Sequence, residues 1–322
     1  MTTTLTRPDE NEEKAPALPV QETIVQPSAA DDDTLPPAPR DGLTAFNSAT
    51  LMIALVTLWV LAQMLFLGSI SQNRAQYELY SDLREGLAMA TIPTGGQIEP
   101  GSAVALMKIP AIGVEQVIVE GSSSSETMLA PGHRRDTPLP GQPGVSLVYG
   151  RASTYGAPFG KALTLAKGDR IEVTSALGDA VFKVSGVRRA GDPLPQPLEQ
   201  GKARLTLVTA EGSGRLAALA PADTAYVDAE LVTKGKGKSE VFADPGGRVS
   251  FVPESEKAMG RDLGALPLLT LCLALLVGLL AVIVIAARRF DTVMVWVVLS
   301  PVALLLAWLT TDTLVRLLPN LV

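Results

Sequence analysis

The chain has 322 residues, a formal net charge of −6, one cysteine and one histidine. The cysteine, Cys272, lies inside a long apolar run, so the polar part of the chain has no disulfide, no thiolate nucleophile and no thiolate metal ligand. With His133 as the only histidine, a zinc site is excluded, and we expect neither a metal nor a cofactor. Residues 101–233 carry 13 basic and 13 acidic side chains, which excludes the basic surface that nucleic-acid binding requires.

The first 47 residues predict a disordered acidic tail. Residues 1–44 contain nine acidic and three basic side chains and are rich in Pro, Thr, Asp and Glu. Such a composition cannot bury enough apolar surface to offset the entropy lost on ordering. We expect residues 1–47 to be a solvated leader in the cytoplasm, and a partner-binding segment is the alternative.

Three apolar runs predict transmembrane helices at residues 48–70, 264–287 and 292–310. Each is near or above the roughly 18–20 residues that a helix needs to cross about 30 Å of hydrocarbon. A cleaved signal peptide is the alternative for the first run. We favour an anchor, because the run starts far from the first residue and no small-residue cleavage pattern follows it.

The topology depends on the pair Arg288 and Arg289, which lies between the second and third runs. Paired arginines between two membrane helices stay in the cytoplasm under the positive-inside rule. The N-terminus is then cytoplasmic, residues 71–263 are extracytoplasmic, and residues 311–322 form a short extracytoplasmic tail. We therefore expect a multi-pass protein of the cell membrane.

The extracytoplasmic part begins with a predicted juxtamembrane helix and linker over residues 71–102. The domain that follows, residues 103–233, consists of short strand-like runs between Gly, Pro and Asp turn signals, with one helix-like stretch at about 157–165. Plausible strands lie at 104–109, 114–120, 145–149, 169–175, 180–187, 204–209 and 224–232. This pattern predicts a mainly β domain in the form of a closed or nearly closed barrel. Residues 234–263 read as a polar linker that returns to the membrane.

The domain also contains a series of short motifs in a fixed order. They are Ile109–Val114, Val119–Gly121, Ala130–His133, Thr137–Gly144, Thr154–Phe159, Lys167–Ile171 and Leu205–Thr209. The series resembles the landmarks of sortases, most of all the class E type of high-GC Gram-positive bacteria. The resemblance implies an eight-stranded barrel that cleaves a C-terminal sorting motif in secreted proteins. In that family a cysteine forms an acyl-enzyme, a histidine exchanges protons, and an arginine stabilises the charge on the intermediate.

At the catalytic positions the chain departs from the family pattern. The family's histidine belongs to a Gly-His-Arg segment, and here Arg151 replaces it after Gly150. The family's cysteine follows the Leu-Val-Thr run, where this chain has Ala210. The family's arginine maps near Thr224, and the nearest basic alternative is Arg215, in a Gly-Ser-Gly loop. An alanine methyl cannot attack a carbonyl, and arginine cannot act as a base at neutral pH.

A relocated mechanism is the alternative to inactivity. His133 occupies the earlier Pro-Gly-His motif, and we interpret it as a loop histidine with a structural hydrogen bond. Ser153, Thr209 or Ser213 could supply a hydroxyl nucleophile, but no second histidine is available to activate one. Glu211, next to Ala210, is best read as a solvated loop acid.

The altered catalytic region is also a candidate ligand groove formed by Arg151, Tyr155, Thr209 and Arg215. Paired N–H donors of arginine suit a carboxylate or a phosphate. The alternative is that Arg151 makes an internal ion pair and fills the space left by the lost catalytic groups.

Three functional hypotheses follow. The preferred one is an inactive, membrane-anchored sortase-like protein of the cell envelope that acts as a binding or assembly module. Its expected partners are a membrane-embedded protein and a cell-wall or secreted-peptide ligand. The alternatives are an active transpeptidase or hydrolase that acts on sorting peptides, and a sensor subunit of a transporter or envelope complex.

Overall fold

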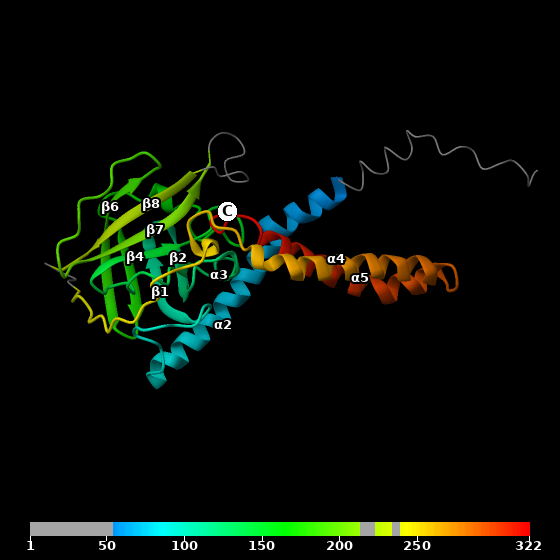
Figure 1. The fold of residues 1–322 in the computed structure, drawn as a ribbon, viewed down its shortest axis with the longest axis horizontal. Helices are drawn as coiled ribbons and strands as arrows, with labels where there is room; N and C mark the ends of the chain where they lie inside the picture. Colours follow the sequence, from blue (N-terminus) through cyan, green and yellow to red (C-terminus); the bar gives the residue numbers. More distant parts are fainter. Residues whose placement is uncertain (1–53, 213–222, 234–238) are drawn as a thin grey trace, which may run out of the picture. The chain divides into compact units, whose positions relative to one another are not determined.

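A computed structural model of the chain describes residues 54–212, 223–233 and 239–322. Three helices in these ranges are long and apolar enough to cross a membrane: Ala54–Met89, Leu263–Ala287 and Val293–Val315. The first is continuous. It contains a π-helical turn, η2 (Gln63–Leu67), and continues as α2 (Gly68–Met89). α4 (Leu266–Ala287) and α5 (Thr292–Val315) pack side by side as a hairpin (Figure 1).

The domain between α2 and α4 is a closed barrel of eight strands, as the sequence predicts. Its strands are β1 (Ala103–Ile109), β2 (Val114–Glu120), β3 (Gly132–His133), β4 (Gly144–Tyr149), β5 (Arg170–Ser175), β6 (Gly178–Arg188), β7 (Ala203–Glu211) and β8 (Asp223–Leu231). They follow the order β1-β2-β3-β4-β7-β8-β6-β5, and β5 pairs with β1 to close the barrel. Most neighbours are antiparallel, but β2 pairs with β3 and β4 pairs with β7 in parallel.

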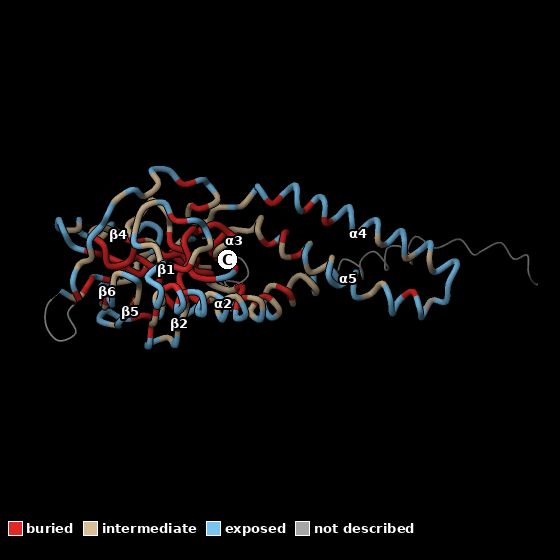
Figure 2. The backbone as a smooth tube through the Cα atoms, turned by 90° about the horizontal axis from the view of Figure 1, so that it is seen from below, coloured by how far each residue is buried: buried red, intermediate tan, exposed pale blue. Residues whose placement is uncertain are grey.

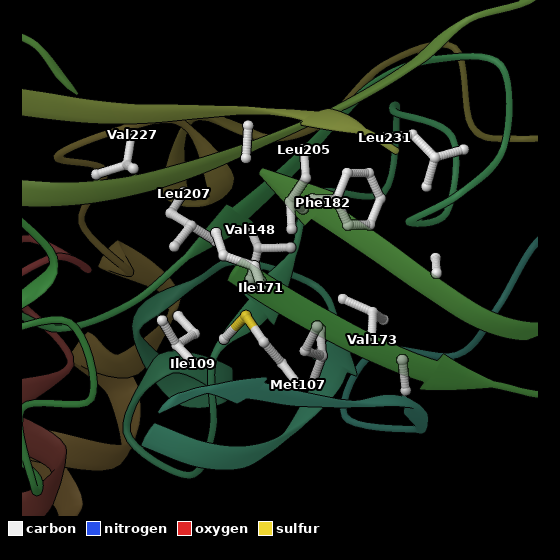
Figure 3. Packing of buried hydrophobic residues seen from close by; sticks show 14 of the residues in the cluster. Met107, Ile109, Val148, Ile171, Val173, Phe182, Leu205, Leu207, Val227 and Leu231 are labelled. Atoms are coloured by element: carbon white, nitrogen blue, oxygen red, sulfur yellow. The ribbon is translucent and has the colours of Figure 1, made fainter. Parts of the chain in front are cut away.

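Alternating apolar side chains fill the barrel. Met107, Ile171, Phe182, Leu205 and Leu207 are fully buried and belong to one core cluster. Figure 3 shows these side chains pointing toward one another from strands on different sides of the barrel. Successive side chains on a strand point to opposite faces, so the same alternation leaves the other residues of β7 facing outward.

Three short elements differ from the sequence-based expectation. β3 has only two residues and carries His133, which we had placed in a loop. A four-residue helix, α3 (Ser124–Thr127), was not predicted, and its capping box of Ser123 and Glu126 explains why it forms. The helix-like stretch at 157–165 contains only the 3₁₀ turn η4 (Ala162–Thr164). Such elements are too short to produce a periodic sequence signal.

The described part of the linker, from residue 239 to 262, is bonded to the barrel. Arg248 pairs with Glu120 and also contacts His133 Nδ1 at 3.1 Å. His133 Nδ1 lies 3.0 Å from Glu120 Oε2, and its Nε2 donates to the Pro138 carbonyl at 2.9 Å. Glu120 and His133 are both buried, so Arg248 completes an internal cluster of charged and polar groups.

We expect Glu120→Ala to lower the free energy of unfolding by about 3–5 kcal/mol, because it leaves Arg248, whose side chain is only 10% exposed, without its carboxylate. Denaturation of the full chain in detergent, followed by circular dichroism, measures this change. Glu115→Ala is the matched control, since Glu115 pairs with Lys108 at an exposed site and should contribute less than about 1 kcal/mol. Equal losses in the two variants would contradict the structural role of the Glu120 cluster.

Candidate functional site

The parallel pairing of β4 with β7 brings the two predicted catalytic positions to one edge of the barrel. Tyr149 lies opposite Val208, and the Gly150 N–H donates to the Val208 carbonyl at 3.0 Å. Arg151 and Ala210 each follow this pair by two residues. The two replaced positions therefore lie at the same end of neighbouring strands.

The site lies on the outer face of these strands. Leu205 and Leu207 point into the barrel core, whereas Val208 and Ala210 belong to a separate apolar cluster. Thr209, between them, points the other way and is fully buried. Its hydroxyl has no hydrogen-bond partner among the described residues. Thr209 and Ala210 therefore do not share a face.

Arg151 is completely buried, and its partners all belong to this chain. Nη1 donates to Thr154 Oγ1 at 3.0 Å and to the main-chain oxygen of Val322 at 2.8 Å. Nη2 donates to the Ser124 carbonyl at 3.3 Å. The guanidinium also stacks over the ring of Tyr155, 5.2 Å from its centroid, which is a cation–π contact.

Burial lowers the pKa of Arg151 to about 10, and the nearby Tyr155 and Asp312 act in the opposite direction. A group with this pKa is still protonated at neutral pH. Arg151 therefore provides a fixed positive charge and hydrogen-bond donors, and it cannot accept the proton that a catalytic histidine would accept.

Tyr155 joins the barrel to the membrane hairpin. Its hydroxyl donates to Asp312 Oδ1 of α5 at 2.7 Å, and its ring is buried with Met128 and Val315. Burial is the main reason that the pKa of Tyr155 is raised, and the Asp312 carboxylate raises it further. Its φ of +48° is a left-handed conformation that few non-glycine residues adopt. The backbone there is held in an unfavourable conformation beside Arg151.

Residues 316–322 follow α5 and lie against this site. Figure 1 marks the end of the chain beside α3, and Figure 2 shows buried backbone around it. Leu321 is fully buried among Tyr149, Val208 and Ala210, so its side chain packs where the family places its nucleophile. The Leu321 carbonyl accepts from the Ala152 N–H at 2.9 Å.

Asn320 anchors the same segment on its other side. Its Nδ2 lies 2.6 Å from the Ser122 carbonyl, 3.0 Å from that of Lys257 and 3.4 Å from that of Ser255. Its backbone N–H donates to Gly260 at 2.9 Å. Ser122 belongs to the barrel and the other three residues to the linker, so the segment is held between the two.

The predicted groove residues are thus only partly brought together. Arg151 and Tyr155 are in contact, Thr209 faces the barrel interior, and Arg215 lies outside the described residues. Thr224, to which we mapped the family's arginine, pairs with Ala210 across β7 and β8. That assignment stays a prediction.

Sequence reasoning missed the residues that complete the site. Two of them are Ser124, which donates to the Leu318 carbonyl, and Thr154, which accepts from Arg151. The other two, Asn320 and Leu321, lie in the segment of residues 316–322 itself. The only signal was Pro319 followed by Asn320, two residue types that are common in turns, and it predicts a turn without indicating where the turn binds.

Among the described residues, none of the hydroxyls considered for a relocated mechanism is hydrogen-bonded to a base. Both ring nitrogens of His133 are engaged within the Glu120 cluster. Ser153 Oγ has no hydrogen-bond partner among the described residues, and Ser213 is not described. Glu211 pairs with Arg189 at 2.7 Å. Within the described ranges, no group of three or more His, Cys, Asp or Glu side chains could hold a metal ion.

The sequence of the barrel decides the family. The model of the Sortase domain family matches residues 107–221, which include β2 to β7 and both replaced catalytic positions. This part of the chain matches the sortase domain, and the barrel that contains it has the sortase fold. Three candidate membrane-spanning helices flank the barrel in the sequence.

Several solved sortases are similar to this chain. The Sortase D5 transpeptidase of Clostridium perfringens is 23% identical, with a TM-score of 0.39, over 51% of this chain and 99% of that chain. The SrtA sortase of Actinomyces oris is 26% identical, with a TM-score of 0.37, over 44% and 85%. Sortase E of Streptomyces avermitilis is 26% identical, with a TM-score of 0.35, over 42% and 90%. A comparison with curated proteins gave no match.

We expect Tyr155→Phe to lower the free energy of unfolding by about 1.5–3 kcal/mol, because it removes a hydrogen bond to the Asp312 carboxylate. Denaturation of the full chain in detergent measures the loss. Tyr77→Phe serves as the control, since Tyr77 is 78% exposed and its change should be close to zero. A Tyr155→Phe variant as stable as the control would show that this contact does not hold the hairpin to the barrel.

Proposed function

We propose that this sortase-family protein is catalytically inactive and acts as an extracytoplasmic binding or assembly module of the cell envelope. The observation that carries the proposal is the occupancy of the two replaced catalytic positions. Leu321 packs against Ala210, and Arg151 holds the Val322 main-chain oxygen. The positions at which the family attacks and protonates a peptide are engaged here by the chain itself.

The chemistry of the residues supports inactivity. The family mechanism needs a nucleophile with an adjacent base. Ala210 has no nucleophilic atom, and Arg151, with a pKa of about 10, is protonated at neutral pH. The hydroxyls of Ser153 and Thr209 have no hydrogen-bond partner among the described residues, and His133 is bonded to Glu120. Neither hydroxyl is therefore paired with a base, so the proposal does not include a serine- or threonine-dependent enzyme.

The membrane orientation is part of the proposal. Arg288 and Arg289 are exposed in the turn between α4 and α5, and the opposite ends of these helices meet where the Asp262 N–H donates to the Arg316 carbonyl. Under the positive-inside rule, the arginine turn is cytoplasmic. The barrel, at the other end of the hairpin, is then extracytoplasmic, and the N-terminal residues are cytoplasmic.

A membrane-embedded protein partner is also proposed. A single anchor would be enough to hold the barrel at the membrane, whereas α4 and α5 add a hairpin with exposed apolar side chains along both helices. Lipid covers such a surface, and so can another membrane protein. A cell-wall or secreted-peptide ligand for the barrel is the second expected partner.

The direct test of inactivity incubates the full chain in detergent with sorting-motif peptides and an amine acceptor. We expect no cleavage or transfer above the protein-free reaction, because neither a nucleophile nor a base is present at residues 210 and 151. Mass spectrometry of the peptides and of the protein measures product and acyl adduct, with an active sortase assayed in parallel. Turnover by the unaltered chain would overturn the proposal.

The double variant Arg151→His with Ala210→Cys restores the two catalytic side chains. It tests whether residues 318–322 also keep a peptide out of the groove. We expect it to form no acyl adduct while residues 318–322 are present, because Leu321 is buried in the same apolar cluster as residue 210. Circular dichroism checks that the barrel is intact. An adduct in this variant would show that residues 318–322 do not block the groove, although the unaltered protein would remain inactive.

A further inference from the structure

Residues 318–322 contact the rest of the protein as a bound peptide would, through main-chain hydrogen bonds and buried side chains. The Leu318 carbonyl accepts from Ser124 Oγ at 2.9 Å, and the Leu321 carbonyl accepts from the Ala152 N–H. The Val322 oxygen accepts from both Arg151 and Thr154. Asn320 and Leu321 are fully buried. The main-chain oxygens of Leu318, Leu321 and Val322 are thus bonded to groups outside the segment, and the side chains of Asn320 and Leu321 are enclosed.

The segment is a turn. The Val322 N–H donates to the Pro319 carbonyl at 3.2 Å, which closes a four-residue turn over Asn320 and Leu321. Proline fixes the φ angle of the residue that enters the turn and so reduces the entropy lost on binding. The site is therefore shaped for a compact turn that begins at a proline.

The side-chain selectivity comes from Asn320 and Leu321. The amide nitrogen of Asn320 faces three carbonyl oxygens, from Ser122, Ser255 and Lys257. An aspartate of the same shape has no N–H there and would place a negative charge against these oxygens. Leu321 enters an apolar pocket that includes the methyl group of Ala210. The site is therefore selective for an amide side chain followed by an apolar side chain.

We propose that this groove is a binding site for peptide turns of the type Pro-Asn-apolar, and that residues 318–322 of this chain are its resident ligand. The inference rests on the proposed function, since it assigns the ligand chemistry of the inactive barrel. A partner that presents the same turn binds when the resident segment leaves.

Tethering explains why the resident segment dominates. A segment joined directly to α5 competes at an effective concentration in the millimolar range, so a free peptide at micromolar concentration cannot displace it. The ligand selectivity is therefore measurable only when the resident turn is removed or weakened.

The probe is a fluorescein-labelled, amidated peptide with the sequence of residues 317–322, Leu-Leu-Pro-Asn-Leu-Val. Binding is measured by fluorescence anisotropy to the intact chain and to a chain that lacks residues 318–322, both in detergent. We expect the shortened chain to bind at least tenfold more tightly. A peptide with aspartate in place of asparagine is the matched control, and it should bind at least tenfold more weakly to the shortened chain.

A point variant covers the case in which the shortened chain does not fold. Asn320→Asp keeps the chain at full length and weakens the resident turn at its amide contact. An accessibility reporter, Ala210→Cys in a Cys272→Ser background, has its thiol under Leu321. We expect maleimide to label this thiol at least tenfold faster with Asn320→Asp than without it, and added asparagine peptide to restore the protection.

The outcomes are distinct. If neither variant binds the asparagine peptide, or if the asparagine and aspartate peptides bind equally, the ligand assignment is wrong, while the inactivity of the barrel is unaffected. Peptide cleavage by the unaltered chain would instead overturn the proposed function. Rapid labelling of the reporter thiol in the otherwise unaltered chain would show that the segment does not cover residue 210.

Discussion

The burial of one guanidinium governs the arrangement around this barrel. A charge removed from water is strongly destabilising unless other groups compensate it. Arg151 is compensated by oxygens of Ser124, Thr154 and Val322, by the ring of Tyr155, and by the nearby Asp312. These groups belong to the barrel, to α5 and to the segment after α5. The Nε of Arg151 has no hydrogen-bond partner among the described residues, and separating the segment from the barrel would also remove the Val322 oxygen from Nη1, so the charge favours the docked arrangement.

Arg151 both replaces the catalytic histidine of sortases and binds the segment of residues 318–322. In sortases a histidine at this position exchanges protons with a substrate, whereas an arginine supplies fixed donors. Ala210 removes the nucleophile and leaves a methyl group against which Leu321 packs. Under the proposed function, the groove that holds a substrate peptide in sortases holds residues 318–322 here. The proposed loss of catalysis and the joint between the barrel and the membrane hairpin then involve the same two residues, Arg151 and Ala210.

The barrel and the membrane helices could be predicted because their signals are local. Strands such as β5 and β6 alternate apolar and polar residues between turn glycines, and the three apolar runs exceed the length that a bilayer requires. The order of the sequence motifs also assigns Arg151 and Ala210 to the family's catalytic positions, and this assignment stays a prediction. The parallel register of β4 and β7 then explains why residues so far apart in sequence meet.

The contents of the groove could not be predicted, because they depend on contacts between distant residues. Arg151 and Val322 are separated by 171 positions, and Asn320 and Ser122 by 198. The seven residues after α5, 316–322, are too few to show a periodicity that predicts a docking face. Residues 311–322 therefore appeared to be a simple tail, although Val315, Asn320 and Leu321 are fully buried. Likewise, the sequence of the linker gave no sign that Arg248 completes the Glu120 cluster.

The most direct test of the account is a disulfide trap between the groove and the segment that fills it. In a Cys272→Ser background, the pair Ala210→Cys and Leu321→Cys should form a cross-link on mild oxidation, because these side chains belong to one packed cluster. The pair Ala210→Cys and Leu314→Cys is the control, since Leu314 is an exposed residue of α5. The account predicts a cross-link in the first pair and little in the second, measured by mass spectrometry of proteolytic fragments. An uncross-linked first pair in a folded protein would contradict it.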